Sequence, residues 1–271
     1  MPKYLGQHFL KNTAVIKKII TAADIQPDET IVEVGPGHGE LTIPLAAAAQ
    51  KLGAKIFTIE KDKKLFDALG PKLAEANVSD IVESINADIL LFFKTGESAK
   101  IARPPFKVVG NIPYYLTGHL LRLLGELESK PGRAIFMIQE EVAERICTEP
   151  PRMNRLAASV QFWATAKIIA RVPRSDFSPP PEVESAVIEL IAKAPEANRG
   201  SAGLSEAQYY RAMRAIFAQP RKTVLNNVAE GSVLSKDEIA TALSAMGIDP
   251  KSRPQDLSIE KISQIAQNFF A

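Results

Sequence analysis

The chain has 271 residues, of which 46% are hydrophobic and 24% charged, which is enough for one large domain and a small one. Cys147 is the only cysteine and the three histidines lie far apart, so an internal disulfide is excluded and a zinc cluster is not expected. Apolar runs fall short of the roughly 18 residues of a membrane helix, and the first residues lack the apolar core of a secretory signal. These features predict a cytoplasmic protein that binds neither a membrane nor a metal.

The net charge is only +2, but the basic residues are clustered. Residues 1–23, 150–175 and 207–229 contain lysine or arginine and no acid. The third stretch carries Arg211, Arg214, Arg221 and Lys222. Such stretches suit a polyanionic partner such as RNA, although ordinary solvated surface explains them equally well.

In chain order, a helix capped by Asn12 or Thr13 is predicted over 13–23. Strands and helices then alternate, with a short helix between the third and fourth strands. The predicted strands cover 30–34, 55–59, 81–85, 106–109 and 134–138, and the main helices cover 39–51, 62–75, 117–127 and 140–147. This alternation is typical of a parallel, doubly wound α/β sheet.

Two further strands, near 166–172 and 185–191, are joined by the proline-rich loop at 177–181. The loop is too short for a crossover helix, so we expect this pair to be antiparallel. Residues 193–204 have the composition of a linker. Helical patterns follow at 205–217, 220–229, 235–246 and 258–270. We therefore predict one domain over 1–192 and an all-helical domain over 205–271.

The first motif that indicates chemistry is a glycine-rich loop after the first strand of this sheet. Gly35, Gly37 and Gly39 alternate with other residues just before a helix. Glycines there allow a sharp turn and let a ligand touch the main chain. A plain tight turn is the alternative, and the loop alone cannot distinguish NAD from S-adenosylmethionine.

Two acidic residues follow the next two strands. Glu60 could accept hydrogen bonds from both ribose hydroxyls of an adenosine, and Asp88 could accept one from an adenine amine. Each could instead be a capping or surface acid. Together with the glycine loop they fall at three successive strand ends, the edge where doubly wound sheets bind ligands.

The segment Asn111-Ile112-Pro113-Tyr114 after the fourth strand indicates the reaction. An aromatic amine is a poor nucleophile because its lone pair is delocalised into the ring. The oxygen of Asn111 and a main-chain carbonyl can hold the two N–H groups so that the lone pair faces a methyl donor. Pro113 stiffens this loop, and Tyr114 can stack on a base that has left its helix.

These motifs resemble the ribosomal RNA adenine N6,N6-dimethyltransferase family of the small-subunit type along nearly the whole chain. The matching segments are 5–10, 33–37, Glu60, Asp88, 110–114, 177–185 and 219–223. The resemblance implies a Rossmann-like class I methyltransferase domain that uses S-adenosyl-L-methionine, and a small helical RNA-binding domain. It also implies small-subunit rRNA of immature 30S subunits as the partner, and we expect the protein to act as a monomer.

The resemblance further assigns roles to residues. His8 and Leu10 would close over the cofactor, whose pocket is lined by Gly35, Gly37, Glu60, Asp88 and Asn111. Phe177 would face the target adenine opposite Tyr114. The implied target is a pair of adjacent adenines in a hairpin loop near the 3′ end of small-subunit rRNA, each methylated twice.

The chain departs from the family pattern at His8, where asparagine is common, and at Met153-Asn154, where Tyr-Gly is usual. The second departure bears on RNA contacts rather than on chemistry. Three other functions remain open: a large-subunit rRNA methyltransferase that confers antibiotic resistance, a DNA adenine or protein glutamine methyltransferase, and an RNA-binding ribosome-assembly factor with little activity.

Overall fold

The computed structural model describes residues 8–101, 105–194, 204–230 and 232–270. The chain forms two compact units. The first runs to Ala143 and includes Ala166–Ala192, and the second contains Glu144–Thr165 together with the residues from Lys193 onward. Residues 144–165, which the sequence assigns to the first domain, thus group with the second.

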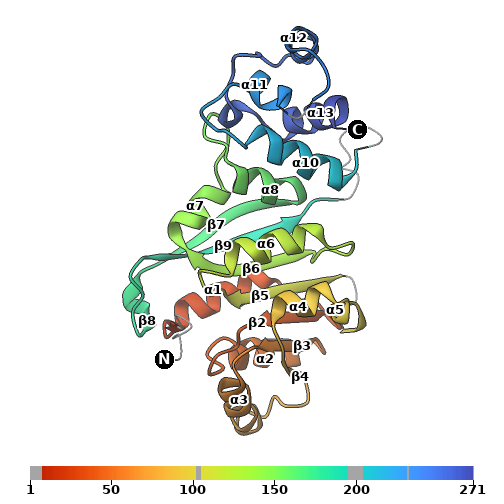
Figure 1. The fold of residues 1–271 in the computed structure, drawn as a ribbon. Coiled ribbons are helices and arrows are strands. Elements are labelled where there is room, and N and C mark those ends of the chain that lie inside the picture. Colours follow the sequence, from red (N-terminus) through yellow and green to blue (C-terminus); the bar gives the residue numbers. More distant parts are fainter. Residues whose placement is uncertain (1–7, 102–104, 195–203, 231, 271) are drawn as a thin grey trace. The chain divides into compact units, whose positions relative to one another are not determined.

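The first unit is built on a seven-stranded sheet of order β4-β3-β2-β5-β6-β9-β7 (Figure 1). The strands are β2 Thr30–Val34, β3 Lys55–Glu60, β4 Val82–Asn86, β5 Phe106–Asn111, β6 Arg133–Gln139, β7 Ala164–Val172 and β9 Ser185–Ala192. Strands β2 to β6 pair in parallel, and β9 pairs antiparallel with β6. The predicted doubly wound fold is confirmed. Its strand order reverses between β2 and β5, which is where such sheets open a crevice.

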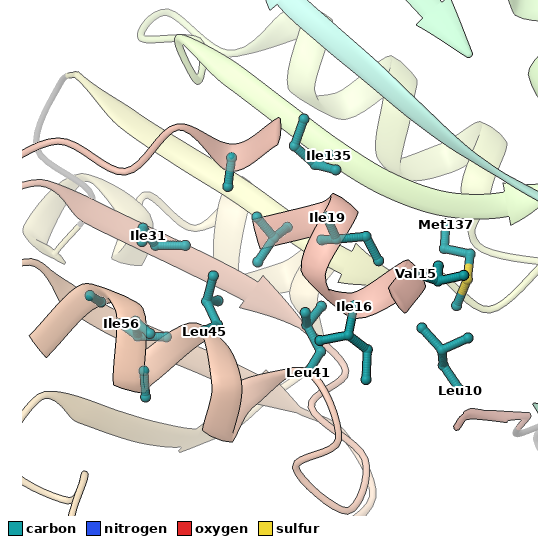
Figure 2. Close-up of a cluster of buried hydrophobic side chains, with 14 of the residues drawn as sticks. Leu10, Val15, Ile16, Ile19, Ile31, Leu41, Leu45, Ile56, Ile135 and Met137 are labelled. Atoms are coloured by element: carbon teal, nitrogen blue, oxygen red, sulfur yellow. The ribbon is translucent and has the colours of Figure 1, made fainter. Parts of the chain in front are cut away.

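Helices precede, connect and follow the parallel strands. They are α1 Thr13–Ala23, α2 Thr42–Gln50, α3 Lys63–Glu75, α4 Ile89–Lys94, α5 Glu97–Ile101, α6 Thr117–Glu126 and α7 Glu140–Ile146. α1, α2 and α3 bury their apolar side chains in one cluster with residues of the sheet. Figure 2 shows Ile16 and Ile19 of α1 pointing into this cluster beside Leu45 of α2 and Ile31 of β2. Because the core fixes the strands, it also fixes the loops at their carboxyl ends.

A two-residue strand pair, which the sequence did not predict, ties the N-terminal segment to the proline-rich loop. β1 Phe9–Leu10 pairs antiparallel with β8 Phe177–Ser178. The amide of Asn12 donates to Asp176 Oδ2 at 2.7 Å, and its oxygen caps α1. This pairing brings Phe9 and Leu10, from the start of the first unit, beside Phe177 and Ser178, from near its end.

The second unit is helical. Its helices are α8 Arg155–Trp163, α10 Glu206–Ile216, α11 Val224–Ala229, α12 Lys236–Ala245 and α13 Ile259–Phe269. The ring of Phe162 stacks on that of Tyr209 with centroids 3.7 Å apart, and the Tyr209 hydroxyl donates to the carbonyl of Ala158. Helix α8 therefore completes the helical core. Most of the predicted linker, residues 195–203, lies outside the described residues.

In the part of the chain that the structure describes, no helix is both long and apolar enough to cross a membrane.

Candidate active site

A pocket of about 260 Å³ opens at the carboxyl ends of the parallel strands of the first unit. Ten residues that the sequence predicts for the site line it: His8, Gly35, Gly37, Glu60, Asp88, Asn111, Ile112, Pro113, Tyr114 and Phe177. They come from six separate stretches of the chain. The sheet brings the glycine loop, both acids and the Asn111 segment together at one edge.

The glycine loop presents bare main chain to the pocket. Gly35 and Gly37 have φ values of 65° and 58°, a left-handed conformation that other residues adopt at a cost. A Cβ atom at Gly35 would meet nothing within 4 Å, whereas one at Gly37 would lie 3.0 Å from the ring of Phe9. A ligand can therefore approach the backbone at Gly35, while Gly37 gives the Phe9 ring its place.

Glu60 ends β3 and is 7% exposed. One carboxylate oxygen accepts from the N–H of Asp62 at 2.8 Å and the other from that of Gly37 at 3.4 Å. Burial raises the pKa of Glu60, and the backbone hydrogen bonds only partly oppose this effect. A ligand that donates further hydrogen bonds would stabilise the charged carboxylate.

Asp88 caps α4 by accepting from the N–H of Leu90 at 2.8 Å. Its second oxygen lies 2.9 Å from the ammonium nitrogen of Lys61. Burial alone would raise the pKa of Asp88, but the hydrogen bonds from Lys61 and Leu90 outweigh it and lower that pKa. Asp88 is therefore a charged acceptor at the pocket and a helix cap at the same time.

Asn111 stands at the last position of β5, beside a close approach of this strand to β2. A Cβ atom at the preceding Gly110 would lie 2.6 Å from the carbonyl oxygen of Val34, so only glycine fits between β5 and β2. The amide nitrogen of Asn111 donates to the carbonyl of His8 at 2.8 Å. This bond uses the donor side of the amide and thereby fixes the orientation of its acceptor oxygen.

Tyr114 is half-buried and anchored at its hydroxyl, which lies 2.9 Å from Ser185 Oγ. Burial raises the pKa of Tyr114, so its phenol stays protonated near neutral pH. The ring faces His8, with centroids 6.2 Å apart, and His8 Nδ1 lies 2.8 Å from the carbonyl of Pro179. Phe177 reaches the same pocket from β8. Two aromatic side chains from distant segments, Tyr114 and Phe177, thus line the same pocket as Asn111.

Leu10 does not line the pocket. It is 4% exposed and belongs to the apolar cluster with Val15 and Met137 (Figure 2). Its side chain thus holds β1 against the core instead of contacting a ligand. The matching residues Leu5, Gly6 and Gln7 lie outside the described residues.

Sequence reasoning missed three contributors to the site. Phe9 packs beside His38, with ring centroids 4.2 Å apart, and covers Gly37. Ser185 anchors Tyr114, and Lys61 pairs with Asp88. Phe9 and Ser185 stand inside the motifs that carry the family resemblance, which was the available signal. The ion pair between Lys61 and Asp88 has no periodic pattern in the sequence that could have indicated it.

The four predicted RNA-binding residues belong to the second unit and are exposed. Arg211 and Arg214 lie on α10, and Arg221 and Lys222 lie just before α11. The ammonium of Lys222 is 2.9 Å from Glu230, so its charge is partly neutralised. Among residues 8–101, 105–194, 204–230 and 232–270, no group of three or more His, Cys, Asp or Glu side chains is placed to hold a metal ion.

Comparison with known proteins gives consistent similarities. Residues 2–270 match the model of the family described as ribosomal RNA adenine dimethylase. A protein named ribosomal RNA small subunit methyltransferase A of Dehalococcoides mccartyi strain CBDB1 is 37% identical over 98% of this chain and 88% of its own length. A relative of the same name in Pelotomaculum thermopropionicum is 36% identical over 98% of this chain and 90% of its own.

Two solved structures share the fold. A dimethyladenosine transferase from Plasmodium falciparum superposes with a TM-score of 0.77, at 24% identity, over 97% of this chain and all of that one. The 23S rRNA methyltransferase ErmE gives a TM-score of 0.70, also at 24% identity, over 96% and 98% of the two chains. At this identity they support the architecture alone.

Proposed function

This chain belongs to the ribosomal RNA adenine dimethylase family, and from that premise we propose that it dimethylates adenine N6 in small-subunit rRNA with S-adenosyl-L-methionine. The target is a pair of adjacent adenines in the hairpin loop near the 3′ end, modified during assembly of the subunit in the cytoplasm. The names of the relatives favour the small subunit over the large-subunit alternative. The observation that supports the chemistry best is the fixed amide of Asn111 beside Tyr114 in the pocket.

The pocket suits a cofactor with an adenosine and a positive charge. Glu60 would accept the ribose hydroxyls, and Asp88 would accept the adenine amine. Ile59, Ile89 and Leu90 provide apolar walls for the base. Two carboxylates at the site would repel the pyrophosphate of a dinucleotide, whereas a sulfonium would be attracted to them. When bound, S-adenosyl-L-methionine supplies an electrophilic methyl group.

The residues of the chain prepare the adenine amine for attack. The oxygen of Asn111, oriented by its bond to His8, accepts one amine N–H. A main-chain carbonyl of the loop at Ile112 and Pro113 accepts the other. These acceptors localise the nitrogen lone pair and become stronger partners as positive charge develops on that nitrogen. Methylation makes the N–H acidic, so the proton can pass to water without a general base.

The target base would lie between two aromatic side chains. Tyr114 and Phe177 reach the pocket from different segments, and the bond of Tyr114 to Ser185 holds its ring in place. Aromatic stacking of this kind compensates for removing a base from its neighbours. After the first transfer one N–H remains, and the methylamine must turn within the pocket before the second.

The roles outside the pocket are proposals too. Arg211, Arg214 and Arg221 would contact RNA phosphates from the helical unit, with a smaller contribution from Lys222 because of Glu230. Leu10 would affect the cofactor only through its main chain, since its side chain is in the core. We propose that the protein acts as a monomer on immature 30S subunits.

The test is methyl transfer from labelled cofactor to immature small subunits, large subunits and DNA, followed by mass spectrometry of nucleosides. We expect N6,N6-dimethyladenosine in small-subunit rRNA alone. Asn111→Ala should reduce turnover on the order of 100–1000-fold with a smaller effect on RNA affinity. Monomethyladenosine alone, or undiminished dimethyladenosine from the variant, would overturn the mechanism, and modified large subunits would overturn the target.

A further inference from the structure

The rim of the pocket has a composition of its own. Among the described residues that line the pocket, those exposed to solvent are Lys61, Tyr115 and His119. We refer to these three as the rim. It combines a cation, a phenol ring and an imidazole, and the carboxylate of Asp88 pairs with the cation and partly neutralises it. The other lining residues are buried or half-buried, so these three are the lining residues most accessible to a macromolecule.

Tyr115 presents its ring to solvent directly beside the proposed base site. Its exposure is 60%, and among the described residues it is the only aromatic one with a strongly exposed side chain of the large hydrophobic kind. The N–H of Leu116 donates to the carbonyl of Pro113 at 2.8 Å, which makes Tyr114 and Tyr115 the two central residues of one turn. Tyr114 is tied inward through Ser185. The same turn therefore places the Tyr114 ring at the pocket and leaves the Tyr115 ring exposed to solvent.

The other two rim residues, Lys61 and His119, favour the binding of an anionic group. Lys61 is held at the rim by Asp88, at 2.9 Å, while its side chain keeps 63% of its surface exposed. His119 is exposed in the first turn of α6, the helix that begins at Thr117 just after Tyr115. An exposed aromatic face flanked by cationic or polar nitrogen groups is the combination that single-stranded nucleic acid binds through its bases and phosphates.

We propose that the rim binds the nucleotide next to the target adenine, with Tyr115 stacking on its base and Lys61 and His119 facing its phosphate. This inference rests on the proposed function, because it needs an RNA strand with one adenine in the pocket. When that adenine leaves the stack, the neighbouring base loses a partner. Tyr115 takes the place of the stacked base that has left, because it directly follows Tyr114, which contacts the target adenine. The rim thereby favours substrates whose target has an unpaired purine as neighbour.

The test uses the full-length protein and the small-subunit rRNA hairpin with the fluorescent base 2-aminopurine beside the target adenine. Stacking on an aromatic ring quenches this base, so the signal reports the contact without requiring catalysis. We compare Tyr115→Leu, which keeps an apolar side chain, with Tyr115→Phe, which keeps the ring. Leu91→Ala is the control, because Leu91 is 59% exposed but does not line the pocket.

Tyr115→Leu should abolish the quenching and weaken RNA binding about 10-fold, as loss of roughly 1.4 kcal/mol of stacking would. Tyr115→Phe and Leu91→Ala should retain both. Affinity for S-adenosyl-L-methionine, measured by calorimetry without RNA, should stay the same in all three variants. A Tyr115→Leu protein that loses cofactor affinity but not RNA affinity would assign the ring to the cofactor and overturn the proposal.

Quenching that survives in Tyr115→Leu, or that the unmodified protein does not produce, would also overturn it. The proposed function fails separately: an unmodified protein that quenches the probe but does not methylate small-subunit rRNA would refute the activity and leave the rim contact standing.

Discussion

Glu33 is a buried carboxyl group near the end of β2, two residues before Gly35. It is 1% exposed, and one of its oxygens has no hydrogen-bond partner in the described part of the protein. Its pKa is raised from 4.5 to about 8, mainly by burial and also by the charges of Glu40 and Glu60, while the side chain of Thr42 opposes this rise only in part. The folded protein therefore keeps Glu33 protonated near neutral pH.

This raised pKa predicts how stability depends on pH. The unfolded chain releases the proton near pH 4.5 and the folded chain near pH 8. Between these values the folded state binds more protons, so the free energy of unfolding falls as the pH rises. Glu33→Gln removes this loss. We expect the variant to gain on the order of 4 kcal/mol over the parent by pH 8, at about 1.4 kcal/mol per pKa unit, and to come close to it near pH 4.5.

Urea unfolding from pH 5 to 9 measures this difference. Glu83→Gln is the matched control, since Glu83 is exposed on β4 and should show no such trend. A gain for Glu33→Gln that is the same at every pH would mean that Glu33 is charged in the folded protein.

Glu60 gives a second prediction at this scale. Glu60→Gln preserves the size of the side chain, whereas Glu60→Ala removes both acceptor oxygens. Hydrogen bonds to charged groups contribute about 1.5–3 kcal/mol, and we expect Glu60→Ala to weaken S-adenosyl-L-methionine binding by that amount and Glu60→Gln by less. Calorimetry measures both, with Glu83→Gln again as control. Unchanged affinity in Glu60→Ala, or tighter binding of NAD than of S-adenosyl-L-methionine, would refute the role of Glu60.

At the scale of elements, α1 couples the core to the site. Its N-cap Asn12 accepts from the N–H groups of Ala14 at 2.9 Å and Val15 at 3.4 Å, and it donates to Asp176 at 2.7 Å. Two residues before it, Leu10 pairs with Phe177 in the β1–β8 ribbon. The cap therefore fixes the start of the helix and the segment that carries His8.

Replacing this cap should destabilise the protein measurably. Asn12→Ala loses the cap and the bond to Asp176, and we expect a loss of about 1–2 kcal/mol in the free energy of unfolding. Asn12→Ser keeps a capping oxygen but is too short for the amide bond to Asp176, so it should recover about half of the loss. Urea unfolding provides the measurement. If serine is no better than alanine, the stability comes from Asp176 and not from the cap.

The same elements show what the sequence could reveal. The strands β2 to β6 and their helices were predictable because each has its own apolar pattern and a boundary residue such as Asn12 or Gly35. Helix α8 was not predicted, because Trp163 runs into β7 without a glycine or proline between them. The β1–β8 pair is only two residues long on each side, too short to show alternation.

The site residues that end strands were predictable from the sequence, whereas those positioned by three-dimensional contacts were not. Glu60, Asp88 and Asn111 could be placed because they end strands of one parallel sheet, so topology alone brings them together. The position of Leu10 could not be predicted, since its side chain turns into the core while its neighbour Phe9 turns to the pocket. Partner choices such as Lys61 with Asp88 depend on three-dimensional proximity that no local pattern encodes.

At the scale of the molecule, the net charge of +2 does not show where the charged side chains lie. The first unit places two carboxylates, Glu60 and Asp88, at its pocket, with Lys61 beside Asp88. The helical unit carries the acid-free stretch 207–229, with Arg214 and Arg221 exposed. Long-range attraction for RNA would therefore come from the helical unit, and the chemistry from the other.

This division predicts how salt affects RNA binding. Each phosphate contact that is lost should make the slope of log affinity against log salt shallower by about 0.7–0.9. Arg214→Glu combined with Arg221→Glu should flatten the slope and weaken binding at low salt. Lys222→Ala should change it less, because Glu230 already neutralises part of that charge.

Affinity for immature small-subunit rRNA, measured from about 50 to 200 mM salt, gives the slope. Lys51→Glu combined with Lys55→Glu is the matched control, since both residues are exposed and Lys55 begins β3, at the end of the strand opposite the pocket. An equal flattening in this control would show that only net charge matters, and an unchanged slope in the double arginine variant would show that residues 207–229 are ordinary solvated surface.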